Sequence, residues 1–243
     1  MGHPSEIDTT FDFRDDTPEG RDPDQYSPTL RRYHKLLWSK PLPSGVIFEL
    51  ADTERGCYLH HQSDLGQFFL SSDAVIHTYW NWIRPKQLAQ TMAQIPDADV
   101  QSFRRIGYTI GGMMIFPGNQ IDRCLTLNQA RGLLTTTIGD RLDLTLECIR
   151  RHYLGQTSPL ADVLWRYGEF FALYGDFRGY VDFFLLQDLT TTDYDVKFFL
   201  PFANFTTPAV PLNVAQYTEY RQRSINFVQA RNQRIASTCG LQR

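Results

Sequence analysis

Residues 128–155, NQARGLLTTTIGDRLDLTLECIRRHYLG, decide the fold that we expect for this chain. Apolar residues recur there at i, i+4, i+7 and i+11, which is the period of an α-helix with one apolar stripe. They are Leu142, Leu146, Ile149 and Tyr153. Gly155 can end the helix in a left-handed conformation. Strand-like segments precede this helix and long apolar segments follow it, so we expect it near the middle of the fold.

A second stripe of the same helix is polar and carries Asp143, Glu147 and Arg150 or Arg151. Leu144 and Cys148 lie off the main apolar stripe, so apolar groups surround much of the helix. We therefore predict that the polar stripe is buried. The alternative is an ordinary solvated face.

The segments before this helix predict a small antiparallel sheet. Three short runs rich in β-forming residues, separated by turn-like residues, favour a meander; they are VIFEL (46–50), CYLHH (57–61) and QFFLSSD (67–73). A buried strand follows in residues 107–121, where Gly111 and Gly112 permit close approach of another backbone. VKFFLPF (196–202) is typical of a further strand. The prediction is a single α+β domain, with a small, mostly antiparallel sheet from 46 to 116 and one later strand, covered by helices.

Start signals place several helices around that sheet. Proline at the first helical position and a serine cap predict helices from Ser27-Pro28 and Ser158-Pro159. Further helices are expected in residues 85–95, 97–106 and 211–237. Residues 179–189 are apolar enough for a buried helix or a central strand, which makes Asp182 a candidate buried acid or base.

Composition limits the class of protein. The chain has 243 residues, of which 42% are hydrophobic and 14% aromatic, enough for a sizeable core. Its apolar runs fall short of the roughly 18 residues that a membrane helix needs, and its N-terminus is unlike a signal peptide, so we expect a cytoplasmic protein without membrane contact. The four cysteines lack C-x-x-C spacing, and buried, inert cysteines are expected. The sequence favours no particular oligomeric state.

The charge is unevenly distributed along the chain. Residues 1–26 contain eight acidic side chains, several prolines and no sustained period, so we predict an irregular acidic arm, followed by a single domain over 27–243. Without the arm the chain is net basic, and an overall charge of −3 is unlike that of a general polyanion binder.

The GRDPD segment at 20–24 lies in this arm. It resembles the water-activating loop G-x-D-P of uracil-DNA glycosylases, in which the aspartate assists departure of the base. The resemblance implies that Asp22 is catalytic. The segment differs in having Asp24 where that family has an aromatic residue, and no later histidine precedes Pro-Ser. An acidic turn is the alternative for Asp22.

Aromatic and basic side chains alternate in the helix expected after Ser27. Rings can stack on bases while cations contact phosphates, so this composition predicts nucleic-acid binding. The candidates are Arg31, Arg32, Tyr33, Lys35 and Trp38, and further along the chain Trp80 and Asn81. Asn81 offers both a donor and an acceptor to a base edge. The alternative is an amphipathic helix whose aromatic rings belong to the core.

A second polar group surrounds the helix of the opening stretch. Asn119 at a turn, Asn128 and Arg131 before the helix, and Asp143 within it are predicted to face one cleft, with Asn119 as a base reader, Arg131 as a phosphate contact and Asp143 as a reserve catalytic carboxylate. The alternatives are a helix cap and an ion pair. Adjacent histidines on a strand point to opposite faces, so we expect no metal site, and no cofactor.

Across almost the entire chain, the succession 27–45, 108–119, 141–155 and 179–188 resembles a family of uncharacterised bacterial proteins of about this length. A fainter resemblance is to phage-defence enzymes that remove modified bases from DNA. The leading hypothesis is therefore an enzyme, a DNA N-glycosylase in antiviral defence. The alternatives are a nucleotide- or NAD-dependent transferase or hydrolase, and a non-enzymatic binding module or toxin partner.

Overall fold

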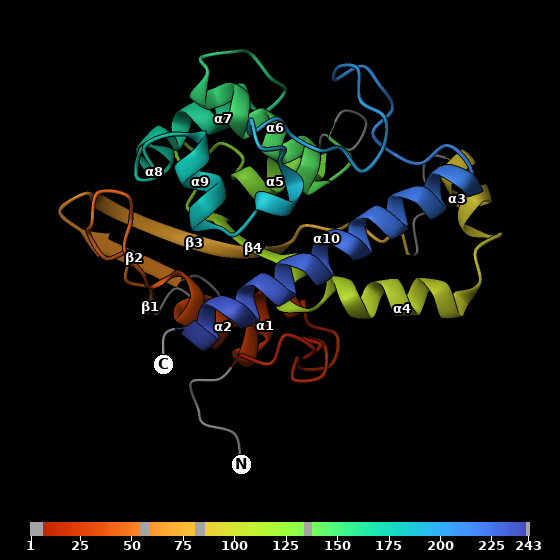
Figure 1. The fold of residues 1–243 in the computed structure, drawn as a ribbon, viewed down its shortest axis with the longest axis horizontal. Helices are drawn as coiled ribbons and strands as arrows, with labels where there is room; N and C mark the ends of the chain where they lie inside the picture. Colours follow the sequence, from red (N-terminus) through yellow and green to blue (C-terminus); the bar gives the residue numbers. More distant parts are fainter. Residues whose placement is uncertain (1–6, 54–58, 81–85, 134–137, 242–243) are drawn as a thin grey trace.

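A small antiparallel sheet lies between two groups of helices in the structure, which is a computed structural model describing residues 7–53, 59–80, 86–133 and 138–241. The sheet order is β1 (Ala51–Asp52), β2 (Leu59–Ser63), β3 (Gly66–Ala74) and β4 (Met113–Pro117). β3 is the longest strand, and it pairs with β2 through its first half and with β4 through its second half. The α+β prediction is confirmed (Figure 1).

Helices come from both ends of the chain, as expected, and two more are inserted between β3 and β4. They are α1 (Pro23–Tyr26), α2 (Pro28–Trp38), α3 (Lys86–Met92), α4 (Asp97–Gly107), α5 (Leu127–Leu133), α6 (Leu142–Tyr153), α7 (Ala161–Arg166), α8 (Gly168–Ala172), α9 (Phe177–Phe183) and α10 (Val214–Leu241), with short 3₁₀ turns η1 (Ile110–Gly112) and η2 (Gln187–Leu189). The long α10 contacts α3, α4, η1 and η2, whereas α6 to α9 form a group on the other side of the sheet (Figure 1).

The helix α6 confirms the reading of the opening stretch. Residues 142–149 are all buried, and Gly155 has φ +67°. The prediction of a buried polar stripe is confirmed for its carboxylates, since Asp143 is 0% exposed and Glu147 3%, whereas the Arg150 and Arg151 side chains are only half-buried. Asp143 pairs with buried Arg141 and accepts a hydrogen bond from the Phe199 N–H at 2.8 Å. Each buried charge therefore has the partners that burial demands.

Close backbone approach at Gly111 and Gly112 is confirmed. A Cβ on Gly111 would lie 2.5 Å from the Val228 carbonyl of α10, and one on Gly112 would lie 2.1 Å from the Gly107 carbonyl. The fully buried Arg231 of α10 then donates to the carbonyls of Gly111 and Met113. These contacts join α10 to the start of β4.

Two expected strands do not form. Residues 196–202 contribute only an isolated bridge between Thr190 and Val196, because side chains occupy the backbone groups that a neighbouring strand would need. The Phe199 N–H donates to Asp143, and the Phe198 carbonyl accepts from Arg223. Likewise, residues 46–50 form only a bridge from Ile47 to Pro41.

The expectation of a buried Asp182 was also wrong. Residues 179–183 belong to the helix α9, and the Asp182 side chain is 46% exposed on its outer face beside Arg178. Helical period, rather than the alternation of a strand, decides which side chains of this segment are covered.

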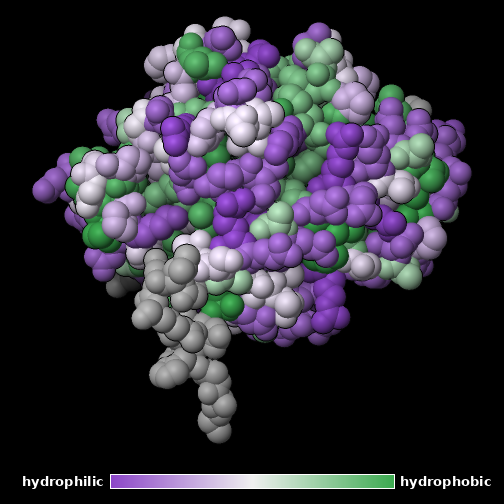
Figure 2. Space-filling view, in the orientation of Figure 1, coloured by the Kyte–Doolittle hydropathy of each residue, from purple (hydrophilic) through white to green (hydrophobic). Residues whose placement is uncertain are grey.

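The surface shown in Figure 2 is mostly hydrophilic, with small hydrophobic patches between polar side chains. In the described ranges, no helix combines the length and the apolar character that a bilayer crossing requires.

Candidate functional site

The GRDPD segment forms a short helical turn against the middle of the sheet. Asp22 caps α1 by accepting a hydrogen bond from the Asp24 N–H at 3.2 Å, and Pro23 occupies the first helical position. Asp24 then accepts the Ala74 N–H of β3 through Oδ2 at 2.7 Å. The arm therefore delivers two carboxyl groups to the end of β3.

Asp24 has an unusual environment for a carboxyl group. Its Oδ1 is buried and has no hydrogen-bond partner in the described part of the chain. Burial, and after it the negative charge of Asp22, raise the pKa of Asp24 to about 7 against the opposing effect of the Ala74 N–H.

The helix α5 places a second set of polar groups beside this turn. Ser71 and Asp73 share one face of β3, and Asn128 and Arg131 share one face of α5. Asn128 donates to the Ser71 hydroxyl at 2.9 Å, and the fully buried Arg131 forms an ion pair with Asp73. Arg131 also lies 3.2 Å from an Asp140 carboxylate oxygen, at the turn before α6.

Two cavities meet at these carboxyl groups, and both are lined by Asp22, Asp24 and Asp73. The first, which we name the polar lobe, has a volume of about 270 Å³. Its other lining residues are Gln25, Ser71, Ser72, Gln120, Thr126, Asn128 and Gln129. Amide and hydroxyl groups dominate this lobe, so it can form hydrogen bonds around most of a small polar ligand.

The second cavity, the aromatic lobe, has a volume of about 340 Å³ and contains Asp140 and His77 beside the shared carboxyl groups. Trp80, 45% exposed, lies at this lobe with the Arg104 guanidinium 3.7 Å from its ring centroid. Burial lowers the pKa of His77 to about 4, and its Nδ1 accepts the Tyr79 N–H. His77 is therefore neutral near pH 7.

The net charge of the two lobes is less negative than their four aspartates alone would make it. Arg131 contacts both Asp73 and Asp140, and Asp24 is partly protonated near neutral pH. Among the described residues, no group of three or more histidine, cysteine, aspartate or glutamate side chains has an arrangement that could hold a metal ion. Burial also raises the pKa of Asp73, against the opposing charge of Arg131, so the site holds two carboxyl groups shifted toward the protonated form, Asp24 and Asp73, beside the exposed Asp22 carboxylate.

The four residues predicted to share one cleft do not all meet. Asn128 and Arg131 lie at the site, although Arg131 is fully buried and engaged with carboxylates. Asp143 is instead buried with Arg141, and the Asn119 carbonyl accepts the Tyr167 hydroxyl at 2.6 Å. Neither Asp143 nor Asn119 lines the two lobes.

The predicted nucleic-acid residues of α2 are largely engaged within the protein. Tyr33 and Trp38 are 2% and 0% exposed, so neither ring has a free face for stacking. Lys35 pairs with Asp52, and Arg31 lies 3.8 Å from the same carboxylate. The Arg32 guanidinium lies over the Tyr33 ring. Asn81 lies outside the described residues, whereas Trp80 does line the aromatic lobe.

Several site residues were missed in the sequence reading: Asp24, Asp73, His77, Arg104, Tyr108 and Asp140. A signal for Asp24 existed, because it replaces the aromatic residue expected after G-x-D-P. The others come from distant segments and have no shared spacing. Cys148 is buried in α6, and burial raises its pKa to about 12, which disfavours a thiolate nucleophile.

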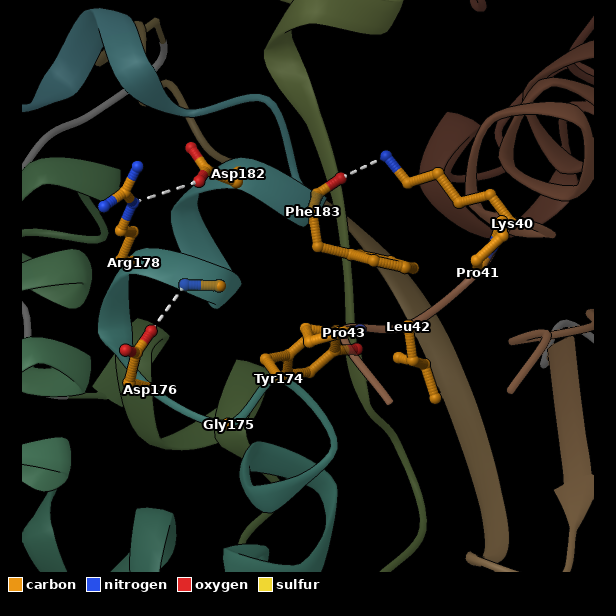
Figure 3. A pocket seen from close by; sticks show the side chains of 11 residues that line it. Lys40, Pro41, Leu42, Pro43, Tyr174, Gly175, Asp176, Arg178, Asp182 and Phe183 are labelled. Carbon is orange, nitrogen blue, oxygen red and sulfur yellow. Dashed lines mark hydrogen bonds and ion pairs between the residues drawn. The ribbon is translucent and has the colours of Figure 1, made fainter. Parts of the chain in front are cut away.

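A further cavity lies between residues 40–43 and α9, with a volume of about 560 Å³ (Figure 3). The polar groups that line it interact with other groups of the protein. Lys40 donates to the Phe183 carbonyl at 2.5 Å, Asp176 caps α9 through the Gly179 N–H, and Arg178 faces Asp182. This arrangement offers no converging acid and base, so we assign the chemistry to the two lobes.

Comparison with known proteins supports the family resemblance found in the sequence. A family model described as "Family of unknown function (DUF6994)" matches residues 7–235. No curated protein and no solved structure matches the chain. The matched range includes α1, both lobes and most of α10. The chain therefore belongs to this family of unknown function.

Proposed function

We propose that this protein is an N-glycosylase, which hydrolyses the bond between a base and its sugar at the meeting point of the two lobes. The observation that supports this most is the pair of carboxyl groups on one turn, Asp22 and Asp24, in different environments. Asp22 is exposed, whereas burial raises the pKa of Asp24 to about 7. Two carboxyl groups in such different environments suit the two roles that glycosidic cleavage needs.

In the proposed reaction Asp24 is the acid and Asp22 is the carboxylate that stabilises positive charge. As the bond between the anomeric carbon and the base nitrogen breaks, the base takes the electron pair of that bond and a proton from the Asp24 carboxyl group. Positive charge develops on the sugar, and the Asp22 carboxylate stabilises it. Water then adds to the anomeric carbon, and its proton returns to Asp24. The products are a free base and a sugar bearing a hydroxyl group.

The proposed substrate is a base in DNA, in line with the resemblance of GRDPD to the glycosylase loop, and antiviral defence is the proposed setting. In such enzymes the base leaves the stack and enters a pocket. A free nucleotide such as NAD is the second candidate. It is favoured by the engagement of Arg31, Lys35 and Arg131 with carboxylates, which leaves fewer cations for a long polyanion.

An assay for released base tests the proposal. Wild-type protein would be incubated with phage DNA containing normal or hypermodified bases, and separately with NAD, and released bases would be measured by mass spectrometry. We expect release by the wild type and a loss of about 100-fold or more in Asp22→Asn. Asp64→Asn, in the exposed β2–β3 turn, is the matched control and should keep full activity. Equal activity of both variants, or no release from any substrate, would reject the proposal.

A further inference from the structure

The guanidinium of Arg104 lies over a tryptophan ring at the aromatic lobe. Arg104 belongs to α4, and its Cζ lies 3.7 Å from the Trp80 ring centroid. Stacking uses the π-face of a guanidinium and leaves the N–H donors in its plane directed outward. Gln101 accepts one of them at 3.1 Å. The stacked ring therefore orients a cation whose remaining donors are available at the edge of the lobe.

No carboxylate lies within ion-pair distance of Arg104 in the described ranges, even though four aspartates line the same lobe. Those aspartates are accounted for otherwise. Arg131 contacts Asp73 and Asp140, Asp24 accepts the Ala74 N–H of β3, and Asp22 caps α1. The positive charge of Arg104 is thus left beside a cavity that otherwise has acidic walls.

We propose that Arg104, stacked on Trp80, binds a phosphate group of the substrate. The inference rests on the proposed function and specifies its substrate class, a phosphorylated sugar. A planar guanidinium binds phosphate through two parallel hydrogen bonds, and a preoriented one loses little freedom on binding. The phosphate has two sources, the monoester of a free nucleotide and the diester of a nucleic acid, and the two share this chemistry.

Ligands without a base test the inference independently of cleavage. The first arm compares the binding of ribose with the binding of ribose 5-phosphate, measured by ligand-observed NMR. The second arm uses a DNA duplex with a tetrahydrofuran abasic-site analogue and the same duplex without it, by fluorescence anisotropy. The variants are Arg104→Gln and Arg104→Lys, with Arg105→Gln as the matched control, because Arg105 is the exposed neighbour on the same helix and lines neither lobe.

We expect ribose 5-phosphate or the abasic duplex to bind about tenfold more weakly to Arg104→Gln than to Arg105→Gln. Arg104→Lys should bind these ligands with intermediate affinity, because an ammonium keeps the charge but loses the two parallel N–H donors and the stacking on the ring. An effect confined to ribose 5-phosphate identifies a monoester, and an effect on the duplex identifies a diester. Equal binding of ribose and ribose 5-phosphate, together with a duplex unaffected by Arg104→Gln, would overturn the inference.

The glycosylase proposal and the phosphate-binding proposal can be rejected independently of each other. Phosphate-dependent binding through Arg104 without any base release would support this inference and reject the glycosylase. Base release that is unchanged in Arg104→Gln would support the glycosylase and reject this inference.

Discussion

Asp24→Asn should lower the rate of base release by about a thousandfold while leaving the protein folded, within the range typical of lost acid–base catalysis. An amide has the shape of the protonated carboxyl group but cannot transfer its proton. In the wild type, burial raises the pKa of Asp24 to about 7, so activity should fall as pH rises through that value. The measurement is base release between pH 5 and 9. A flat profile over this range, or an active Asp24→Asn, would contradict the assigned role.

The stability of the same variant distinguishes catalysis from folding. The folded protein binds the Asp24 proton more tightly than the unfolded chain, whose pKa is near 3.8. Between about pH 4 and 7 the unfolded chain therefore binds fewer protons, and the contribution of Asp24 to stability falls as pH rises. Asparagine cannot ionise, so Asp24→Asn should melt at pH 8 at the wild-type temperature or above it. A large drop in the melting temperature would instead indicate a structural role for Asp24.

Asp143→Ala should destabilise the protein by about 3 kcal/mol or more, because it leaves the buried charge of Arg141 without its partner. It also removes the acceptor of the buried Phe199 N–H. For a chain of this size, that corresponds to a drop of roughly 6–12 °C in melting temperature. Base release per folded molecule should persist, because Asp143 lines neither lobe.

Asp182→Ala is the control for that substitution. Asp182 is 46% exposed and faces Arg178 at 3.7 Å, an exposed pair that contributes less than about 1 kcal/mol. Its melting temperature should stay near that of the wild type. A melt of Asp143→Ala within one degree of wild type would show that the buried stripe of α6 is not needed for stability.

Local patterns predicted α2 and α6 well because the causes of these helices are local, whereas α7 begins at Ala161 without a side-chain cap and not at Ser158-Pro159. The stripe of α6 and its glycine end follow from helical period and backbone conformation. The burial of the Trp38 side chain could also have been predicted. Leu30, Tyr33, His34, Leu37 and Trp38 repeat at i, i+3, i+4, i+7 and i+8, and all are buried on one face of α2. Their burial matches the alternative of an amphipathic helix whose aromatic rings belong to the core.

The segment 196–202 shows why strands were harder to predict. Its composition favours a strand, but strand formation requires a partner, and here Asp143 and Arg223 take the backbone groups. Tertiary contacts therefore override the local preference.

Only part of the candidate site had a sequence signal. Asp22 was found through its motif, and Asn128 and Arg131 through their position before α6. Asp73 lies 58 residues from its partner Arg131, and nothing in their spacing connects them. The raised pKa of Asp24 depends on burial against β3, which no local pattern encodes.

A carboxyl group that remains protonated near neutral pH is the central claim about this site. It can be measured directly by following the ¹³C chemical shifts of aspartate carboxyl groups between pH 3 and 9, with Asp24→Asn to assign the resonance. The account predicts that the aspartate resonance lost in Asp24→Asn titrates at about pH 7. If the Asp24 resonance instead titrates near pH 4, the assignment of the catalytic acid is contradicted.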